Sequence, residues 1–169
     1  GIVSTYIALY SVEELQLPHG AGAFFLLFSI GLILSRLVGG RTLRQGKIVQ
    51  NGTIGVLLGV CGYSLFALVH NEWSFYLSAL TMGLGNGHMF PAMQNIFMGI
   101  CTKEQRGTAN STLLVSWDVG VGIGTLAGGI AADSLGFHAA FLVAAGVNLV
   151  GALFYILHTR ADFRRRRIG

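Results

Sequence analysis

The chain has 169 residues, of which 53% are hydrophobic and only 11% are charged, and it carries a net charge of +4. Its mean hydropathy of +0.64 excludes an ordinary water-soluble domain, because such a domain needs polar residues to cover its surface. The composition instead predicts an all-α, polytopic membrane protein whose helices cross lipid.

Five apolar runs have the length of about 18 to 25 residues that a helix needs to cross a bilayer. A further run at residues 1–10 is too short to cross alone and resembles the second half of a span. Because the chain also begins with Gly1 rather than Met, we expect a fragment with about five and a half helices. The expected spans lie near residues 1–10 (partial), 21–38, 48–69, 73–100, 108–132 and 139–157.

The basic residues predict how these spans are oriented. All eleven fall into three clusters, whereas the connections around residues 11–20, 71–72 and 133–138 contain no Lys or Arg. Since Lys and Arg concentrate on the cytoplasmic side, we expect an inner (plasma) membrane protein whose basic tail, residues 159–169, is cytoplasmic. A basic run directly after a span more often contacts anionic lipid than nucleic acid, so we expect no nucleic-acid partner. The clusters are Arg36, Arg41, Arg44 and Lys47; Lys103 and Arg106; and Arg160, Arg164, Arg165, Arg166 and Arg167.

The predicted span at residues 73–100 carries the candidate substrate-cavity residues. Steps of about 100° per residue place several Met and Phe side chains and one amide on a single stripe. Such a stripe suits an apolar or mixed organic substrate, although Met and Phe at this spacing are also typical of core packing. His88, on the opposite face, can either relay a proton or make one hydrogen bond to a neighbouring helix. The cavity candidates are Asn86, Phe90, Met93 and Gln94.

Asp118 is an acid near the middle of the predicted span at residues 108–132. An ionised carboxylate at that depth costs about 2.5 to 3.5 kcal/mol, so it needs a compensating interaction. Small and polar residues share its helical face: Ser111, Gly122, Thr125 and Gly129. We therefore expect Asp118 to face protein or a water-filled cavity, either binding and releasing a proton or fixing one helix against another.

Three stretches resemble the major facilitator superfamily of membrane transporters. Residues 83–95, GLGNGHMFPAMQN, are similar to the glycine-rich tenth helix of bacterial efflux-type members, with its proline and glutamine. Residues 103–124, KEQRGTANSTLLVSWDVGVGIG, resemble the cytoplasmic turn with its Arg-Gly pair and the eleventh helix with an Asp-x-Gly run. Residues 35–47, SRLVGGRTLRQGK, resemble the degenerate second copy of the cytoplasmic loop motif. The motif positions here are Arg36, Gly40, Arg41, Arg44 and Gly46.

The third stretch departs from the family pattern G-R-x-x-D-R-x-G, because no acid precedes its second arginine, Arg44. The resemblance as a whole implies a twelve-helix transporter whose two six-helix halves rock by alternating access. On this interpretation residues 1–158 are the C-terminal half, and the spans that carry Asn86 and Asp118 line the central cavity.

From this resemblance we predict a secondary transporter of small organic solutes, of the efflux type, that acts as a proton antiporter. An uncoupled facilitator of the same fold and a truncated, non-transporting remnant are the alternatives. The expected partners are a small-molecule substrate, protons, the lipid bilayer and the N-terminal half of the same transporter. The sequence has no HExxH, GxSxG or CxxC motif, so we expect no enzyme, no metal site and no cofactor.

Overall fold

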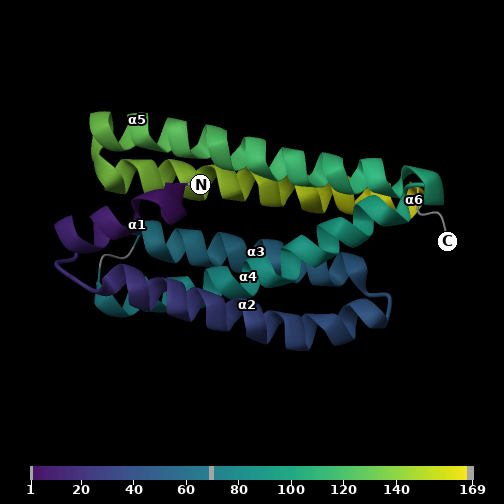
Figure 1. Ribbon diagram of the computed structural model, residues 1–169, viewed down its shortest axis with the longest axis horizontal. Helices are drawn as coiled ribbons and strands as arrows, with labels where there is room; N and C mark the ends of the chain where they lie inside the picture. The colour runs from purple at the N-terminus through teal and green to yellow at the C-terminus, as the bar shows by residue number, and fades with distance from the viewer. Residues whose placement is uncertain (1, 69–70, 167–169) are drawn as a thin grey trace.

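The computed structural model describes residues 2–68 and 71–166, and every regular element within these residues is a helix, joined to the next by short turns, which confirms the predicted all-α fold. A 3-10 turn, Lys103–Gln105, and a π-helical segment, Tyr155–Thr159, complete the chain of helices. Long helices lie side by side along one direction (Figure 1). The α-helices are α1 (Ile2–Glu13), α2 (Gly20–Arg44), α3 (Ile48–Leu68), α4 (Glu72–Gly99), α5 (Arg106–Phe154) and α6 (Arg160–Arg166).

Helix α5 contains both of the spans expected at residues 108–132 and 139–157. Gly136 divides it, because this residue has φ 85° and ψ 164°, a conformation that is essentially restricted to glycine. The chain reverses at this point, so that the two arms of α5 run antiparallel (Figure 1). Gly136 thus forms the turn between the two spans that the sequence predicts.

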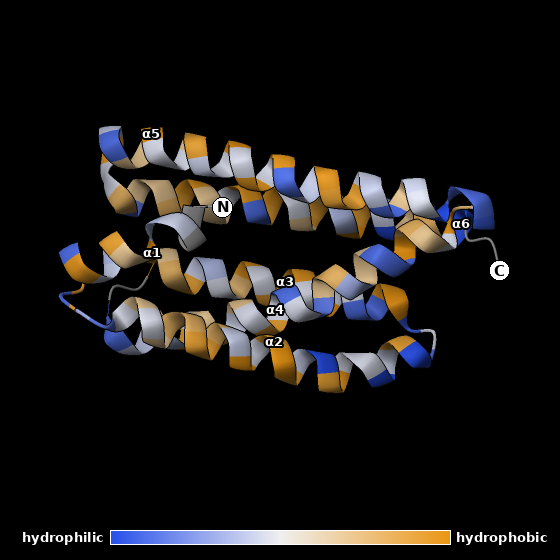
Figure 2. Ribbon diagram, in the orientation of Figure 1, coloured by the Kyte–Doolittle hydropathy of each residue, from blue (hydrophilic) through white to orange (hydrophobic). Residues whose placement is uncertain are grey.

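Three helical segments of the described chain are long and apolar enough to cross a membrane: Gly20–Arg44, Ile48–Leu68 and the continuous stretch Lys103–Arg166 that includes both arms of α5. Figure 2 shows apolar residues along the length of these helices. Helix α4 is 28 residues long but does not belong to this set, since its polar residues lower its hydropathy. The expected spans at 21–38 and 73–100 correspond to α2 and α4, and α2 continues as helix to Arg44.

Helix α4 lies against both α2 and α3 at main-chain distance. A Cβ atom built on Gly31 of α2 would lie 2.6 Å from the main-chain oxygen of Leu80 in α4. A Cβ on Gly55 of α3 would lie 2.6 Å from the main-chain nitrogen of Met89, also in α4. Small residues at these positions allow the close van der Waals packing that holds helices together in lipid.

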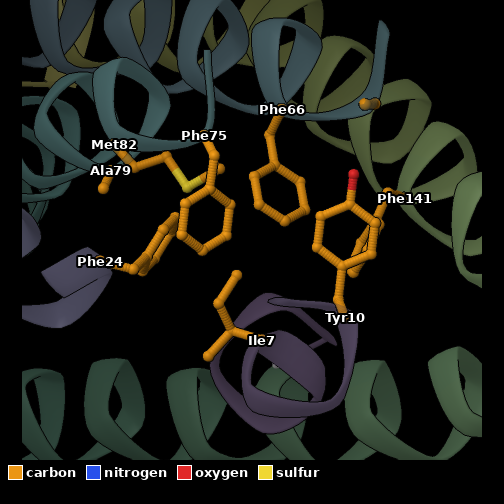
Figure 3. Packing of buried hydrophobic residues seen from close by; sticks show 9 residues of the cluster. Ile7, Tyr10, Phe24, Phe66, Phe75, Ala79, Met82 and Phe141 are labelled. Carbon is orange, nitrogen blue, oxygen red and sulfur yellow. The ribbon is translucent and has the colours of Figure 1, made fainter. Parts of the chain in front are cut away.

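An aromatic core joins the five helices α1 to α5 at the end of the bundle that contains the Gly136 turn (Figure 3). The ring of Phe141 lies 4.6 Å from that of Phe66 and 4.9 Å from that of Tyr10, both edge-on. Edge-to-face geometry of this kind stabilises aromatic pairs beyond the area that they bury. The buried members are Ile7, Tyr10, Phe24, Phe66, Ala67, Phe75, Ala79, Met82 and Phe141.

A second apolar cluster ties the C-terminal segment to the bundle. Tyr155 donates a hydrogen bond from its hydroxyl to the main-chain oxygen of Val49 in α3, at 3.1 Å. Phe163 of α6 is buried, and its ring lies 3.0 Å from the position that a Cβ on Gly99 would occupy. The buried members are Val49, Val56, Ile96, Ala152, Tyr155 and Phe163.

The three predicted basic clusters gather toward one end of the bundle. The α2–α3 connection, the end of α4, the start of α5 and helix α6 all lie at this end (Figure 1). The end of α1, the start of α4 and the Gly136 turn lie at the opposite end (Figure 1), and the acidic residues Glu13, Glu72 and Asp133 belong to these segments. The cytoplasmic orientation of the basic end stays a prediction.

Candidate functional site

The candidate cavity residues of α4 divide between two neighbouring helices. Asn86 forms a side-chain hydrogen bond with Tyr63 of α3. Met93 packs against the second apolar cluster, which includes Val49 and Val56 of α3. Asn86 therefore contacts α3, and Met93 takes part in the packing around the second apolar cluster.

The other two candidates face the first arm of α5. The ring of Phe90 lies 5.4 Å from that of Trp117 in an edge-on contact at 89°. One turn further along α4, the Gln94 side-chain nitrogen Nε2 donates a 3.0 Å hydrogen bond to Oδ1 of Asn110. We refer to these four residues, Phe90, Gln94, Asn110 and Trp117, as the α4–α5 seam.

The seam offers both aromatic surface and amide groups. The Gln94 carbonyl oxygen and the Asn110 amide nitrogen make no other hydrogen bond among the residues that the structure describes, so each can bind a further polar group. The Trp117 side chain is exposed, and Phe90 is half-buried. The arrangement can therefore contact an organic solute through ring stacking and one or two hydrogen bonds.

Asp118 follows Trp117 directly and is exposed on the surface of α5. No hydrogen bond or ion pair of Asp118 occurs within residues 2–68 and 71–166. Part of its stripe is covered by α1, since the Tyr6 hydroxyl donates a 3.3 Å hydrogen bond to the main-chain oxygen of Thr125. At Gly122, by contrast, a Cβ would meet no atom within 4 Å. The Asp118 stripe is thus packed at one end and open around the acid.

The remaining exposed surface of α5 differs in chemistry from the Asp118 stripe. Val115, Val119 and Ile123 recur at four-residue spacing and are each more than half exposed. Helical steps of about 100° put this apolar row roughly a quarter turn from Asp118. Lipid suits a row of large apolar side chains, whereas a stripe of Asp, Ser and Gly suits protein or water.

His88 and Asn51 form a buried polar junction, of which the sequence alone points only to His88. The Asn51 amide donates a 2.9 Å hydrogen bond to the main-chain oxygen of His88. The His88 ring nitrogen Nδ1 lies 2.8 Å from the main-chain oxygen of Leu84 in its own helix. A Cβ on Gly39 of α2 would lie 3.1 Å from atoms of both side chains. His88 thus contributes to the contact between α2, α3 and α4, and Asn51 was missed because its sequence surroundings resemble ordinary glycine-rich helix packing.

The loop-motif residues lie at the end of α2 and in the turn that follows. Arg36, Arg41 and Arg44 are all exposed and form no ion pair within the described chain. Gly46 adopts φ 75°, and its amide donates to the main-chain oxygen of Leu43 at 3.0 Å, which closes the turn. A left-handed residue at this position favours glycine. A Cβ on Gly40 would meet no atom within 4 Å, so this glycine makes no close helix contact.

Comparison with known proteins identifies a family and several relatives. The family model described as "Major Facilitator Superfamily" matches residues 1–167. The chain is 29% identical to "Multidrug resistance protein MdtG" of Citrobacter koseri, in an alignment that covers 96% of the chain and 41% of that protein. It is 28% identical to the proteins of the same description in Salmonella paratyphi B and Salmonella newport, over 69% of the chain and 28% of each relative. The chain therefore spans less than half the length of these relatives, and no solved structure matches it.

Proposed function

The chain belongs to the Major Facilitator Superfamily of membrane transporters, and we propose that it is the C-terminal six-helix half of a proton-coupled exporter of small organic solutes. Members of this family move solutes across membranes and are not enzymes. In such folds two halves rock against each other around a site near the bilayer midplane. The relatives described as multidrug resistance proteins support efflux as the direction of transport.

The observation that carries the proposal is the α4–α5 seam. Its Phe90–Trp117 pair and its Gln94–Asn110 amide pair combine apolar surface with hydrogen-bonding groups and no charge. Amphipathic organic molecules need both kinds of contact, whereas phosphates and metal ions need charged ligands. On this basis the seam contributes to the solute site, with Asn86 bound to α3 and Met93 packed into the second apolar cluster.

Asp118 is the proposed proton carrier. It is one residue from the seam, on a polar stripe that is open in this chain. A carboxyl group that alternates between a wet and a dry environment binds and releases a proton, because desolvation favours its neutral form. The stripe would face the N-terminal half of the transporter, which is the proposed protein partner.

The proposed orientation follows the positive-inside rule. Residues 1–158 would form the membrane half and residues 159–169 the cytoplasmic tail of an inner (plasma) membrane protein. The loop-motif residues Arg36, Arg41 and Arg44, with Gly40 and Gly46, would then lie at the cytoplasmic surface. Cysteine labelling of the α2–α3 and α3–α4 connections from each side of the membrane tests this arrangement.

The proposed function is tested with the full-length transporter that contains this chain, reconstituted in proteoliposomes. We expect an imposed proton gradient to drive ethidium movement in the wild type, and Asp118→Asn to abolish the response to the gradient. Asp133→Asn, an acid on the same arm of α5 but at its far end, is the matched control and should leave transport unchanged. Gradient-driven transport that persists in Asp118→Asn would overturn the coupling role, and gradient-independent flux in the wild type would favour an uncoupled facilitator.

A further inference from the structure

A groove lies at the basic end of the bundle, between the end of α4 and the C-terminal segment. Its volume is about 610 Å³, within the range of small-molecule sites. One wall is apolar and includes Phe97, Ile100 and Leu157, while the other includes His158 and Arg165. The groove is separate from the α4–α5 seam, whose residues do not line it.

The basic wall of the groove is fixed to the bundle rather than being part of a free tail. Phe163 is buried against Gly99 of α4 and anchors α6. The preceding π-helical segment, Tyr155–Thr159, is held by the hydrogen bond from Tyr155 to Val49. Because Tyr155 and Phe163 are both held against the bundle, the fold defines the position of Arg165 relative to the apolar wall.

The charges around the groove leave it with an excess of cationic groups. Asp162 pairs with Arg166, whose Nε lies 2.8 Å from Oδ1. Arg165 has no acidic partner within the described chain. His158 also lines the groove, with its ring 5.2 Å from that of Phe154, and adds a further hydrogen-bonding group. An anion therefore fits this wall better than a cation or a neutral molecule.

The apolar wall selects among anions. Leu157 and Phe154 line the groove and are each more than half exposed. A soluble phosphate would leave these side chains in contact with water, whereas an acyl chain would cover them. Since the groove combines a cationic group, an apolar wall and a place at a helix end, its chemistry matches an amphiphile of the membrane surface.

We propose that this groove binds one anionic phospholipid, with its phosphate on Arg165 and His158 and an acyl chain along Phe97, Ile100 and Leu157. The site depends on the chain being embedded in a membrane and is independent of proton coupling at Asp118. The bound lipid would be a ligand of the C-terminal region that is distinct from the transported solute.

The test is native mass spectrometry of the full-length transporter in detergent, with phosphatidylglycerol or phosphatidylcholine of identical acyl chains added. We expect retention of phosphatidylglycerol over phosphatidylcholine, and a loss of about fivefold in phosphatidylglycerol affinity for Arg165→Gln. Arg164→Gln is the matched control, because Arg164 lines a different cavity on the side of Gly46 and Lys47. An equal loss in both variants, or equal retention of both lipids, would overturn the proposal.

A second set of measurements distinguishes a bound lipid from a bound soluble phosphate. Leu157→Asn should weaken retention of phosphatidylglycerol, while Leu37→Asn, on the exposed surface of α2, should not. Glycerol phosphate at the concentration of the lipid should fail to displace it. Displacement by glycerol phosphate, or full retention in Leu157→Asn, would identify a soluble-anion site instead. Asp118→Asn should retain the lipid as the wild type does, so that a failure of proton coupling is distinguishable from a failure of this site.

Discussion

The Asn51 amide of α3 donates a 2.9 Å hydrogen bond to the main-chain oxygen of His88 in α4, at a point where both residues are buried. The other atom of the same amide, Oδ1, has no hydrogen-bond partner within the described chain. Gly39 of α2 packs against both side chains. One polar residue on α3 thus joins three helices at the centre of their contact.

We expect Asn51→Ala to lower the free energy of unfolding by about 1 to 2 kcal/mol, because it removes an interhelical hydrogen bond and leaves a small cavity. Thermal unfolding in detergent, followed by circular dichroism, measures the change. Gln50→Ala, at the adjacent exposed position, should leave the midpoint unchanged. Equal stability of Asn51→Ala and the wild type would show that the hydrogen bond is not needed to hold α3 on α4.

Two glycines of α3 predict different changes in stability when each is replaced by alanine. Gly55→Ala should destabilise the bundle by roughly 1 to 3 kcal/mol, because its Cβ would lie 2.6 Å from the Met89 main-chain nitrogen and neither helix backbone can yield locally. Gly59→Ala places its Cβ 3.7 Å from the Asn148 side chain, an ordinary contact, and should be tolerated. The same thermal unfolding assay compares them, and a smaller loss at Gly55 than at Gly59 would contradict the packing described.

Gly136→Ala should cost about 1 to 3 kcal/mol, since φ 85° with ψ 164° is disfavoured for any residue with a Cβ. No atom lies within 4 Å of the added methyl, so the cost comes from the backbone alone. Gly146→Ala, in the second arm of α5 with equally open surroundings, should be neutral or slightly stabilising because alanine favours helix. Unfolding in a denaturant titration should separate the two variants clearly.

The exposed turn before α5 contains a carboxyl group, that of Glu104, whose pKa depends on a neighbouring hydroxyl group. Hydrogen bonds from its own backbone amide and from the Thr102 side chain lower the pKa of Glu104 below the ordinary carboxyl value. The stabilisation is therefore present above the ordinary pKa and is lost as pH falls through the lowered one. Thr102→Ala should raise the pKa of Glu104, and Thr102→Ser should preserve it, in an NMR titration of the carboxyl carbon. A Glu104 pKa that is the same in all three proteins would refute the role of the hydroxyl.

Transport should depend on the aromatic part of the α4–α5 seam. Trp117→Ala is expected to reduce kcat/KM for export of an aromatic cation by about tenfold, the upper range for loss of one aromatic contact. Trp73→Ala is the control, because Trp73 is 84% exposed at the start of α4, at the far end of the helix from Gln94. Unchanged kinetics in Trp117→Ala at normal protein levels would remove the seam from the solute site.

The helices and the gathering of basic residues at one end could be predicted because both depend on local information. An apolar run of sufficient length predicts a helix wherever it occurs, and Gly136 lies within the connection expected at residues 133–138. The neighbours of each helix face could not be predicted in this way. Asn86 and Phe90 lie one turn apart on α4, yet Asn86 contacts α3 and Phe90 contacts α5. A helical wheel gives the angular positions of side chains around one helix, but it does not show where the neighbouring helices lie.

The partners of the candidate residues were missed for the same reason. Asn110 and Trp117 are separated by seven residues and so share a face of α5, which is a signal that the sequence contains. Only the antiparallel arrangement of α4 and α5 brings this face to Gln94 and Phe90. Asp118 was identified from its cost in lipid, which requires no knowledge of its neighbours.

The main-chain contacts of α4 with α2 and α3 determine where this bundle can open. Separating α4 from Gly31 or Gly55 would pull whole backbones apart, and the three helices therefore move as one block. The contacts across to Trp117 and Asn110 are made by side chains, which can swing to new rotamers without shifting either helix axis. A solute that enters between α4 and the first arm of α5 would accordingly displace these side chains and leave α2 and α3 in place.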